Sequence, residues 1–511
     1  MNQTGKFLGT RKCDGFFAAQ KERYFAVSFD DVRLVTDYSE ILPTQTSLKS
    51  HFSRNVGLNT PIVSSPMDTV TEYKMGIAIA MDGGLGIIHK GLDPITQAAH
   101  VAKVKHRLNV FLTDPICIKS DDKVADILRM KEAKDYGFSS FPVMDNNGRI
   151  VGIVTSNDFE FCPDIENSFI SDIMSSQLIS ALPGTNVMEA YSIMCKHHKK
   201  ILPIFDDSRN LQGIYTLADV KRKITNNIEG YNLDKNGSLF VGAAVGVSAD
   251  DRERAELLVQ KGVDVLVIDT AHGNSLGVVE MLKYLKKTYS NIDVVAGNIS
   301  EGEAAKRLVA AGADGLRIGQ GPGSICTTRI TAGIGHPQVS AIYECEKAIR
   351  GSGVPICADG GIRYSGDIAV AMGAGADSVM LGNLLAGTTE SPGDVFFKNG
   401  KAVKVYRGMG SLEAMKEHKT SRQRYGQIEG GTDKLVPEGV SGEVLFKGEV
   451  HAVLHQLLGG LRAGLGYLGV KEVSFLKENA DFHLVSNSGM QESHPHDLFS
   501  MNEAPNYRSP R

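Results

Sequence analysis

Eight short, nearly continuous apolar segments constrain the fold of this chain more than any other feature. Stretches with helical periodicity, such as ADDRERAELLVQKG and SEGEAAKRLVAAG, lie between most of them. Uninterrupted apolar runs are typical of parallel strands that are buried on both faces. The alternation therefore predicts an α/β fold, a (β/α)₈ or TIM barrel, rather than an open doubly wound sheet. The segments are TPIVSSPM, GLGIIH, LFVGAAVG, VDVLVIDTAH, IDVVAGNI, DGLRIGQG, VPICADGGI and SVMLGN.

An internal repeat interrupts this pattern after the second predicted strand. SFPVMDNNGRIVGIVTSNDF and ILPIFDDSRNLQGIYTLADV align at a constant offset of 61 residues, as Pro142 and Pro203 do. Each copy reads strand, polar turn, strand, and then T-x-x-D at the start of a helix. The chain thus contains a paired module inserted into the barrel. The predicted parts are the barrel segment 1–109, the first repeat 110–168, the second repeat 169–228 and the barrel segment 229–511.

The inserted pair resembles a tandem CBS (Bateman) module. The resemblance implies that a regulatory purine nucleotide binds through the threonine and the aspartate of each T-x-x-D motif. Asn157 and Ala218 stand where many relatives carry an arginine that contacts phosphate. The threonines are also suited to cap the helices that they precede, which is the alternative reading. The four motif residues are Thr155, Asp158, Thr216 and Asp219.

The composition excludes several classes of protein. A net charge of −4 over 511 residues gives no electrostatic footprint for nucleic acid, and no apolar run is long enough for a transmembrane helix. The N-terminus lacks the pattern of a secretory signal, and the seven cysteines include no CxxC pair. We therefore expect a cytoplasmic protein that binds neither membranes nor nucleic acid. The C-terminal SPR distantly resembles a peroxisomal signal, so a peroxisome-like or glycosome-like compartment stays open.

The candidate active face lies at the C-terminal ends of the strands, where TIM barrels carry their catalytic loops. GPGSICTTR directly follows the sixth predicted strand and places Cys326 on that face. A lone cysteine is either a small buried residue or a nucleophile. After strands seven and eight, DGGI and GN supply glycines suited to phosphate, and Asp359 is suited to ribose hydroxyls. Tight turns and a helix cap are the alternative readings of those glycines and of Asp359.

A set of motifs together resembles the IMP dehydrogenase/GMP reductase family over about residues 29–511. The cysteine loop is shared by both branches of that family, whereas a long flap with an Arg424–Tyr425 pair, here within 400–450, is a feature of the dehydrogenases. A GMP reductase that uses NADPH and a nucleotide-sensing regulator on the same scaffold are the alternatives. The flap argues against the first, and the intact catalytic residues argue against the second. The motifs are TPIVSSPMDTVTE, GPGSICTTR, ADGGIRYSGDI, YRGMGSLEAM, SRQRYGQ, DKLVPEGV and QESHPHD.

The dehydrogenase branch implies the NAD-dependent oxidation of IMP to XMP, the committed step of guanine nucleotide synthesis. Cys326 would add to C2 of the purine, and the adduct would expel hydride to NAD before water hydrolyses it. Thr328 would orient that water, and Arg424, assisted by Tyr425, is the family's candidate base. Because arginine is ordinarily a permanent cation, a relay through Thr328 and Glu438 is the alternative.

The resemblance also implies three binding sites and an assembly. IMP would contact Ser65, Met67, Ser324, Asp359, Gly361, Gly382, Asn383, Tyr406, Gly408, Met409, Gly410 and Glu438. NAD, for which no Rossmann fingerprint is present, would contact Asp269, Asn298, Arg317 and Gly319, with His272 and Asn274 as less certain contacts. A potassium ion would bind carbonyls of Gly321, Gly323 and Cys326, together with Glu492, Ser493 and His494 of a neighbouring copy. This shared site implies a homotetramer, and the pairing of tetramers into octamers stays open.

Overall fold

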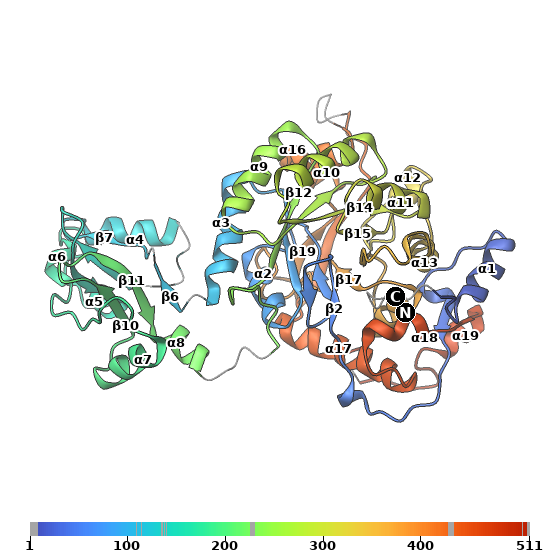
Figure 1. Cartoon of the computed structure of the whole chain (residues 1–511), viewed down its shortest axis with the longest axis horizontal. Helices are drawn as coiled ribbons and strands as arrows, with labels where there is room; N and C mark the ends of the chain where they lie inside the picture. The colour runs from blue at the N-terminus through green and yellow to red at the C-terminus, as the bar shows by residue number, and fades with distance from the viewer. Residues whose placement is uncertain are drawn as a thin grey trace. The chain divides into compact units, whose positions relative to one another are not determined.

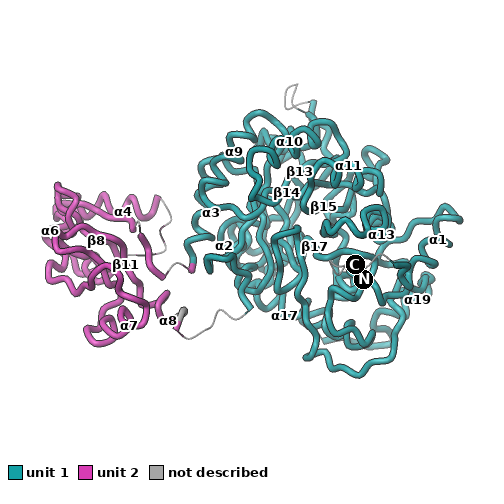
Figure 2. Tube along the Cα trace, viewed as in Figure 1, with its two compact units in different colours: residues 1–107, 230–511 teal, residues 108–229 magenta. Residues whose placement is uncertain are grey.

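The chain forms two compact units, Met1–Arg107 with Gly230–Arg511, and Leu108–Glu229 (Figure 2). The computed structural model describes residues 9–108, 110–113, 115–133, 136, 138, 140–224, 230–427, 434–502 and 504–507. Parts of the predicted segments lie outside the described residues, among them the end of the second repeat, 225–228, the predicted flap positions 428–433 and the C-terminal SPR, 509–511.

Unit 1 contains a closed barrel of eight parallel strands (Figure 1). The strands follow one another in chain order around the barrel, and the last one closes the ring by pairing with the first. This confirms the (β/α)₈ barrel, because each predicted apolar segment holds one strand. Alternate strand residues fill a common core, among them Val63, Leu85, Val267 and Val295. The strands are β4 (Ile62–Ser64), β5 (Leu85–Ile88), β12 (Val241–Val245), β13 (Val265–Asp269), β14 (Asp293–Ile299), β15 (Gly315–Ile318), β16 (Ile356–Asp359) and β17 (Ser378–Leu381).

Helices surround the barrel and connect its strands (Figure 1). Local sequence explains where they begin: the Asp93 side chain accepts hydrogen bonds from the N–H groups of Ile95 and Thr96, both at 3.0 Å, and Pro94 occupies the first helical position. The helices are α2 (Tyr73–Met81), α3 (Pro94–Lys105), α9 (Ala249–Gln260), α10 (Leu276–Thr288), α11 (Gly302–Ala310), α13 (Gln338–Ile349), α14 (Ser365–Ala374) and α17 (Val450–Tyr467).

Short elements flank the C-terminal ends of the barrel strands. A three-stranded antiparallel sheet has β19 at its centre, and two short helices follow β19 in the chain. We call the segment 411–426, which holds these two helices, the flap. These elements are α12 (Thr328–Thr331), β18 (Phe396–Lys398), β19 (Lys401–Arg407), α15 (Leu412–Glu417), α16 (Lys419–Arg424) and β20 (Ser441–Leu445).

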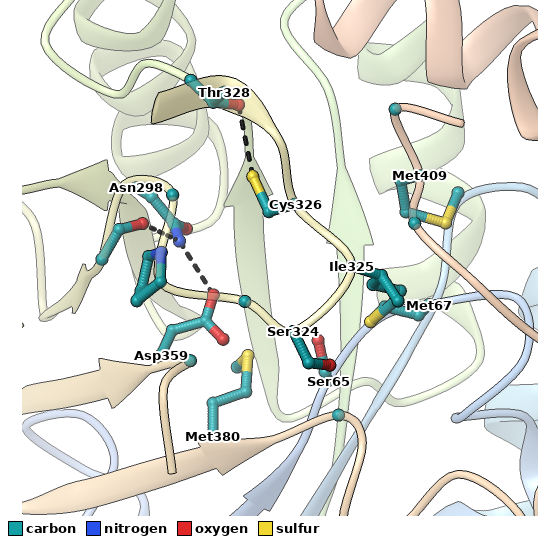
Figure 3. A pocket seen from close by; sticks show the side chains of 18 of the residues that line it. Ser65, Met67, Asn298, Ser324, Ile325, Cys326, Thr328, Asp359, Met380 and Met409 are labelled. Atoms are coloured by element: carbon teal, nitrogen blue, oxygen red, sulfur yellow. Dashed lines mark hydrogen bonds between the residues drawn. The ribbon is translucent and has the colours of Figure 1, made fainter. Parts of the chain in front are cut away.

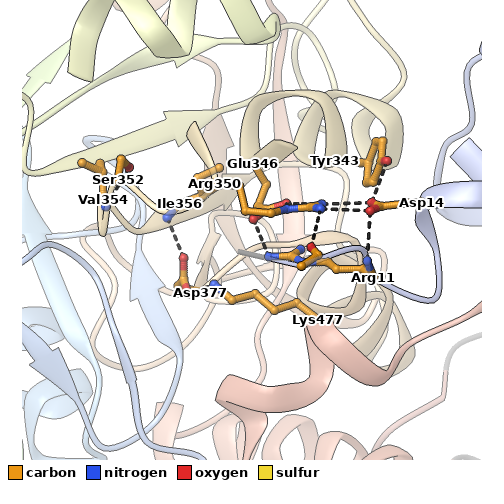
Figure 4. A network of polar contacts seen from close by, with 11 residues as sticks. Arg11, Asp14, Tyr343, Glu346, Arg350, Ser352, Val354, Ile356, Asp377 and Lys477 are labelled. Carbon is orange, nitrogen blue, oxygen red and sulfur yellow. Dashed lines mark hydrogen bonds and ion pairs between the residues drawn. The ribbon is translucent and has the colours of Figure 1, made fainter. Parts of the chain in front are cut away.

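The two terminal segments pack on the barrel. Arg11, ahead of α1, forms an ion pair with Glu346 of α13, and Asp14, the first residue of α1, pairs with Arg350 directly after α13 (Figure 4). Strand β1 pairs with β21. No helix in the described ranges is long and apolar enough to cross a membrane. The remaining elements of unit 1 are α1 (Asp14–Glu22), η1 (Phe29–Asp31), β1 (Val32–Leu34), η2 (Pro43–Gln45), β2 (Ser50–His51), β3 (Gly57–Leu58), η5 (Val473–Phe475), α18 (Leu476–Asn479), β21 (Phe482–Leu484) and α19 (Asn487–Glu492).

Unit 2 consists of two similar halves, each with its own three-stranded sheet and apolar core. Strand β6, at the start of the unit, pairs with β11 and so completes the sheet of the second half. Its elements, with η3 (His106–Leu108) at the junction, are β6 (Phe111–Leu112), β7 (Ile118–Lys119), α4 (Val124–Ala133), β8 (Phe141–Met144), β9 (Ile150–Val154), α5 (Ser156–Glu160), α6 (Ile170–Ile173), α7 (Val187–Lys196), β10 (Ile201–Phe205), β11 (Leu211–Thr216) and α8 (Leu217–Ile224).

Candidate active site

A cavity at the C-terminal ends of the barrel strands brings most of the predicted site residues together (Figure 3). It is lined by loops that follow β4, β15, β16, β17 and β19, and by the flap. The predicted residues along its wall are Ser65, Met67, Asn298, Arg317, Gly319, Gly321, Gly323, Ser324, Cys326, Thr328, Asp359, Gly361, Gly382, Asn383, Tyr406, Gly408, Met409, Gly410, Arg424, Tyr425 and Glu438.

The cysteine loop presents Cys326 to this cavity. Its thiol donates to the hydroxyl of Thr328 at 3.2 Å (Figure 3). That hydroxyl donates to the Glu438 carboxylate at 2.8 Å. The loop is fixed from behind, since Val440 N–H donates to the Ile325 carbonyl at 3.0 Å. The arrangement links a potential nucleophile, a hydroxyl and a carboxylate in one chain of hydrogen bonds.

The other cysteines of unit 1 lie in different surroundings. Cys13, Cys345 and Cys357 are buried, and burial raises the pKa of the Cys13 thiol to about 11 and that of Cys357 to about 12. A thiolate, rather than a thiol, is the nucleophile. Cys326 is therefore the cysteine of this unit that is placed for chemistry on a ligand.

Glycines and a tyrosine form one end of the cavity. Gly360 and Gly361 both have positive φ values, 91° and 84°, which other residues rarely adopt. A side chain on Gly382 would place Cβ 3.0 Å from the Tyr406 hydroxyl. Burial raises the pKa of Tyr406 to about 12 despite a hydrogen bond with Ser324, so the hydroxyl stays protonated. This end therefore combines glycine backbone with the hydroxyls of Ser324 and Tyr406, a combination suited to an anionic ligand group.

An apolar wall adjoins this end of the cavity, because a Cβ on Gly382 would also lie 3.3 Å from Met67 Sδ. Figure 3 shows Met67, Ile325 and Met409 grouped together, with Ser65 below them. The ring of Tyr425 covers Gly410, where any Cβ would lie 2.7 Å from the ring. A planar base fits between flexible methionine side chains and close backbone.

Two aspartates and two arginines form a buried charge cluster beneath the cavity. Arg317 bridges the carboxylates, donating to Asp359 at 2.9 Å and to Asp269 at 2.8 Å. Arg424 of the flap forms an ion pair with the second oxygen of Asp269. Burial alone would raise the pKa of Asp269, but the cations Arg424, Arg317 and Lys90 hold it well below its usual range. The reading of Asp359 as a helix cap is wrong, because α14 begins only after Tyr364.

Asn298 completes this cluster with an unsatisfied acceptor. Its amide N–H₂ donates to Asp359 Oδ2 at 2.8 Å and to the Gly319 carbonyl at 2.7 Å. Its carbonyl oxygen is buried and has no hydrogen-bond partner among the residues that the structure describes. Buried acceptors ordinarily find a donor, so this oxygen fits a ligand hydroxyl or amide.

Several residues near the site were not predicted from the sequence. Lys90, directly after β5, is buried and donates to the Asp269 carbonyl at 2.6 Å. Gln320, which was also not predicted, contacts the ring of His272 at 3.1 Å. His272 and Asn274 were predicted as cofactor contacts; neither lines the cavity, and Asn274 accepts a hydrogen bond from Arg307. A lysine after a buried strand was the available signal for Lys90, since an ammonium group there needs an acceptor.

The predicted cation ligands are divided between two places in this chain. Gly321 and Gly323 lie on the cysteine loop, whereas Ser493 and His494 line a separate pocket with Tyr364. Among the described residues, histidine, cysteine and carboxylate side chains form no cluster of three that could hold a metal ion. Any cation on the loop would therefore be bound by backbone carbonyls, which suit a hard ion.

The T-x-x-D motifs of unit 2 make the local contacts of a helix cap. The N–H and hydroxyl of Thr155 both donate to Asp158 at 2.7 Å. The Thr216 hydroxyl donates to Asp219 at 2.5 Å. These contacts account for the motifs without a ligand.

The chain is similar over most of its length to known enzymes. A family model described as IMP dehydrogenase / GMP reductase domain matches residues 26–496. An inosine-5′-monophosphate dehydrogenase of Halalkalibacterium halodurans is 47% identical over 489 residues, covering 96% of this chain and 98% of the relative. That of Aquifex aeolicus is 45% identical over 485 residues, covering 94% and 97%. A solved GMP reductase of Trypanosoma brucei, in complex with guanosine 5′-monophosphate, gives a TM-score of 0.82 at 38% identity, covering 93% of this chain and 98% of that one.

Proposed function

The chain belongs to the IMP dehydrogenase/GMP reductase family and is an NAD-dependent oxidoreductase that acts on IMP, and from this premise we propose how its residues divide the reaction. The reductase reading is less favoured, since identity to the dehydrogenases reaches 47% and identity to the solved GMP reductase is 38%. The observation that carries the proposal is the hydrogen-bonded chain Cys326–Thr328–Glu438 on the cavity wall.

In the first half-reaction, Cys326 adds to IMP. The Cys326 thiol releases its proton to water, a bond forms between the resulting thiolate sulfur and C2 of the purine, and the hydrogen on C2 leaves as hydride. NAD supplies the hydride acceptor. The product of this step is a thioimidate on Cys326, which is oxidised at C2 and still bound in the cavity.

In the second half-reaction, water cleaves the thioimidate. The water oxygen bonds to C2, the carbon–sulfur bond breaks, and XMP leaves. Thr328 orients the water, and Glu438, which accepts its hydrogen bond at 2.8 Å, receives the proton through it. Arg424 is cationic in this conformation, because its pairing with Asp269 outweighs burial and raises its pKa above the usual range. We therefore assign proton acceptance to Glu438 here, and charge stabilisation to Arg424 with Tyr425.

The same cavity would hold IMP in one orientation. The phosphate would lie at the glycine and tyrosine end, the ribose on Asp359, and the base along the methionine wall. The phosphate end is formed by Ser324, Gly361, Gly382, Asn383 and Tyr406. The base would contact Ser65, Met67, Gly408, Met409, Gly410 and Glu438.

The cofactor would bind beside the purine with its ribose at Asp269. Asn298, with its unpartnered carbonyl oxygen, supports this position, and Arg317 would act by orienting both aspartates. Arg424 now occupies the oxygen of Asp269 that a ribose hydroxyl would use. NAD binding and the docked flap therefore exclude each other at this carboxylate.

The cation site, the assembly, the effector site and the compartment complete the proposal. Carbonyls of Gly321, Gly323 and Cys326 would hold potassium with Glu492, Ser493 and His494 of a neighbouring copy. Such a site requires an oligomer, which by family resemblance would be a homotetramer. Unit 2 would bind a purine nucleotide as a CBS pair does. The seven cysteines are free thiols, which supports a reducing compartment such as the cytoplasm.

The experiment that tests this function is a steady-state assay with IMP and NAD. The full chain should produce NADH, and Cys326→Ala should abolish turnover while IMP binding, followed by calorimetry, is retained. Cys117→Ala is the matched control, because Cys117 is exposed in unit 2. NADPH consumption with GMP, and none with IMP and NAD, would reverse the assignment to the reductase branch.

A further inference from the structure

The two flap helices are joined at Glu417 and His418, two polar residues that contact side chains shortly after β4 and at the end of β19. α15 ends at Glu417 and α16 begins at Lys419, with His418 between them. α16 carries Arg424, whose ion pair with Asp269 docks the far end of the flap. The junction is therefore a second point at which this segment is held, one helix away from the catalytic pair.

The junction contacts a buried ion pair. Arg407, the last residue of β19, donates to Asp68 Oδ2 from Nε at 2.9 Å and from Nη2 at 2.6 Å. His418 Nε2 lies 3.1 Å from the same oxygen and 3.3 Å from Arg407 Nη2. Glu417 lies 2.7 Å from Arg407 Nη1 on the outer side. Burial would raise the pKa of Asp68, but these hydrogen bonds from His418 and Arg407 lower it, so the carboxylate is ionised.

Asp68 and Arg407, the two residues that the junction contacts, are neighbours in sequence of residues that line the substrate cavity. Asp68 directly follows Met67 of the apolar wall, and Arg407 lies between Tyr406 and Gly408, which line the cavity. Asp68 is anchored whether or not the flap is docked, because Arg407 alone gives it two hydrogen bonds. Glu417 and His418 therefore bind to an ion pair, Asp68–Arg407, that is already formed without them. We call Glu417 and His418 together the latch.

We propose that Glu417 and His418 are positioning residues that hold the flap docked for the hydrolytic half-reaction. The proposal rests on the proposed function. The docked flap places Tyr425 over Gly410 and Arg424 against Asp269, while NAD needs the same carboxylate. The latch therefore sets the balance between a docked state that hydrolyses the adduct and an undocked state that binds NAD.

Loss of the latch should lower both kcat and KM for NAD, whereas a structural defect would lower kcat and raise KM. A hydrogen bond to a charged group is worth about a tenfold population shift. In His418→Ala, kcat should fall about tenfold because the docked state is rarer, and KM for NAD should also fall because the competing flap is weaker. The burst of NADH, which precedes hydrolysis, should keep its rate. A general disturbance of the site would raise KM and slow the burst.

The test uses the full chain and three variants. His418→Ala removes the contact, and His418→Gln should restore much of it, since a glutamine amide can donate to Asp68 and accept from Arg407. Lys416→Ala is the control, because Lys416 is an exposed residue of α15, the helix that ends just before His418. Hydrogen exchange of residues 411–426 without ligands should be faster in His418→Ala and unchanged in Lys416→Ala.

These measurements separate failure of the latch from failure of the function. If wild type makes no NADH from IMP and NAD, the proposed function fails, and exchange still reports whether His418 holds the flap. If wild type is active and His418→Ala leaves kcat, KM for NAD and exchange unchanged, the latch is refuted. A raised KM for NAD, or a slowed burst, would instead make His418 a structural residue.

Discussion

Two buried charge clusters in unit 1 have the same composition but different surroundings. Each joins two carboxylates to two arginines with little exposure to solvent. One cluster lies beneath the cavity and is formed by residues at barrel strand ends and in the flap. The other cluster joins the N-terminal segment to α13 through ion pairs (Figure 4). The first comprises Asp269, Asp359, Arg317 and Arg424, and the second Asp14, Glu346, Arg11 and Arg350.

The difference lies in what surrounds each cluster and in what carries its members. Tyr343 donates to Asp14 at 2.9 Å, and its ring stacks on Phe17 at 3.9 Å, so apolar packing accompanies the N-terminal cluster. At the active face, Arg317, Asp359 and Arg424 line a cavity, and Arg424 is carried by a flap helix. Buried ion pairs alone therefore do not identify a site. A functional site is indicated instead when a charged side chain, such as that of Arg424, lines a cavity and is carried by a segment that is anchored separately from the barrel.

The largest expected effect comes from removing the charge on the flap. In Arg424→Ala, steady-state turnover should fall by about 10²–10³-fold, as for loss of a group that stabilises charge in the transition state. The NADH burst should persist, because hydride transfer requires only IMP, Cys326 and NAD. Rapid mixing gives the burst rate, and the intact mass of quenched protein counts the adduct on Cys326.

The counterpart in the other cluster controls for loss of a buried arginine. Arg350→Ala should lower the melting temperature and leave kcat of the folded protein unchanged, with no adduct accumulating. A lost burst in Arg424→Ala would place that residue in the redox step. Equal effects of the two variants on turnover would remove the distinction between the clusters.

Much of the barrel was predictable because burial on both faces leaves a continuous apolar signal in each strand. The loop of Cys326 and the glycines after β16 and β17 followed from their position at strand ends. Ion pairs carry no such signal. Asp68 and Arg407 lie 339 positions apart, and the local sequence around either residue does not identify the other as its partner. The role of His418 was not predicted for this reason. Arg317 was predicted as a cofactor contact, but in the structure its guanidinium forms ion pairs with both Asp269 and Asp359.

A smaller effect is expected from neutralising one carboxylate of the N-terminal cluster. The hydrogen bond from Arg350 is the main cause that holds the pKa of Asp14 below its usual range. A depressed pKa adds stability above the ordinary carboxyl value of about 4, and this stability is lost as pH falls below it. Asp14→Asn should therefore cost about 2 kcal/mol at pH 7 and flatten the acid dependence of the melting temperature. The kcat of Asp14→Asn should stay at the wild-type value. If the melting temperature of Asp14→Asn depends on acid pH as that of wild type does, then Arg350 does not stabilise the Asp14 carboxylate.

The smallest effect is expected from removing unit 2, because neither cluster uses a residue from it. All eight members lie in unit 1, and so do the residues that line the cavity. Unit 2 has its own two apolar cores, so its loss exposes no part of the barrel core. Replacing residues 110–228 with a short Gly/Ser linker should leave kcat and both KM values within about twofold of wild type. The two clusters should then respond to Arg424→Ala and Asp14→Asn as they do in the full chain. If the shortened protein folds, as shown by its melting transition, but makes no NADH, then unit 2 acts on the active site, and the cavity cluster depends on more than the barrel and its flap.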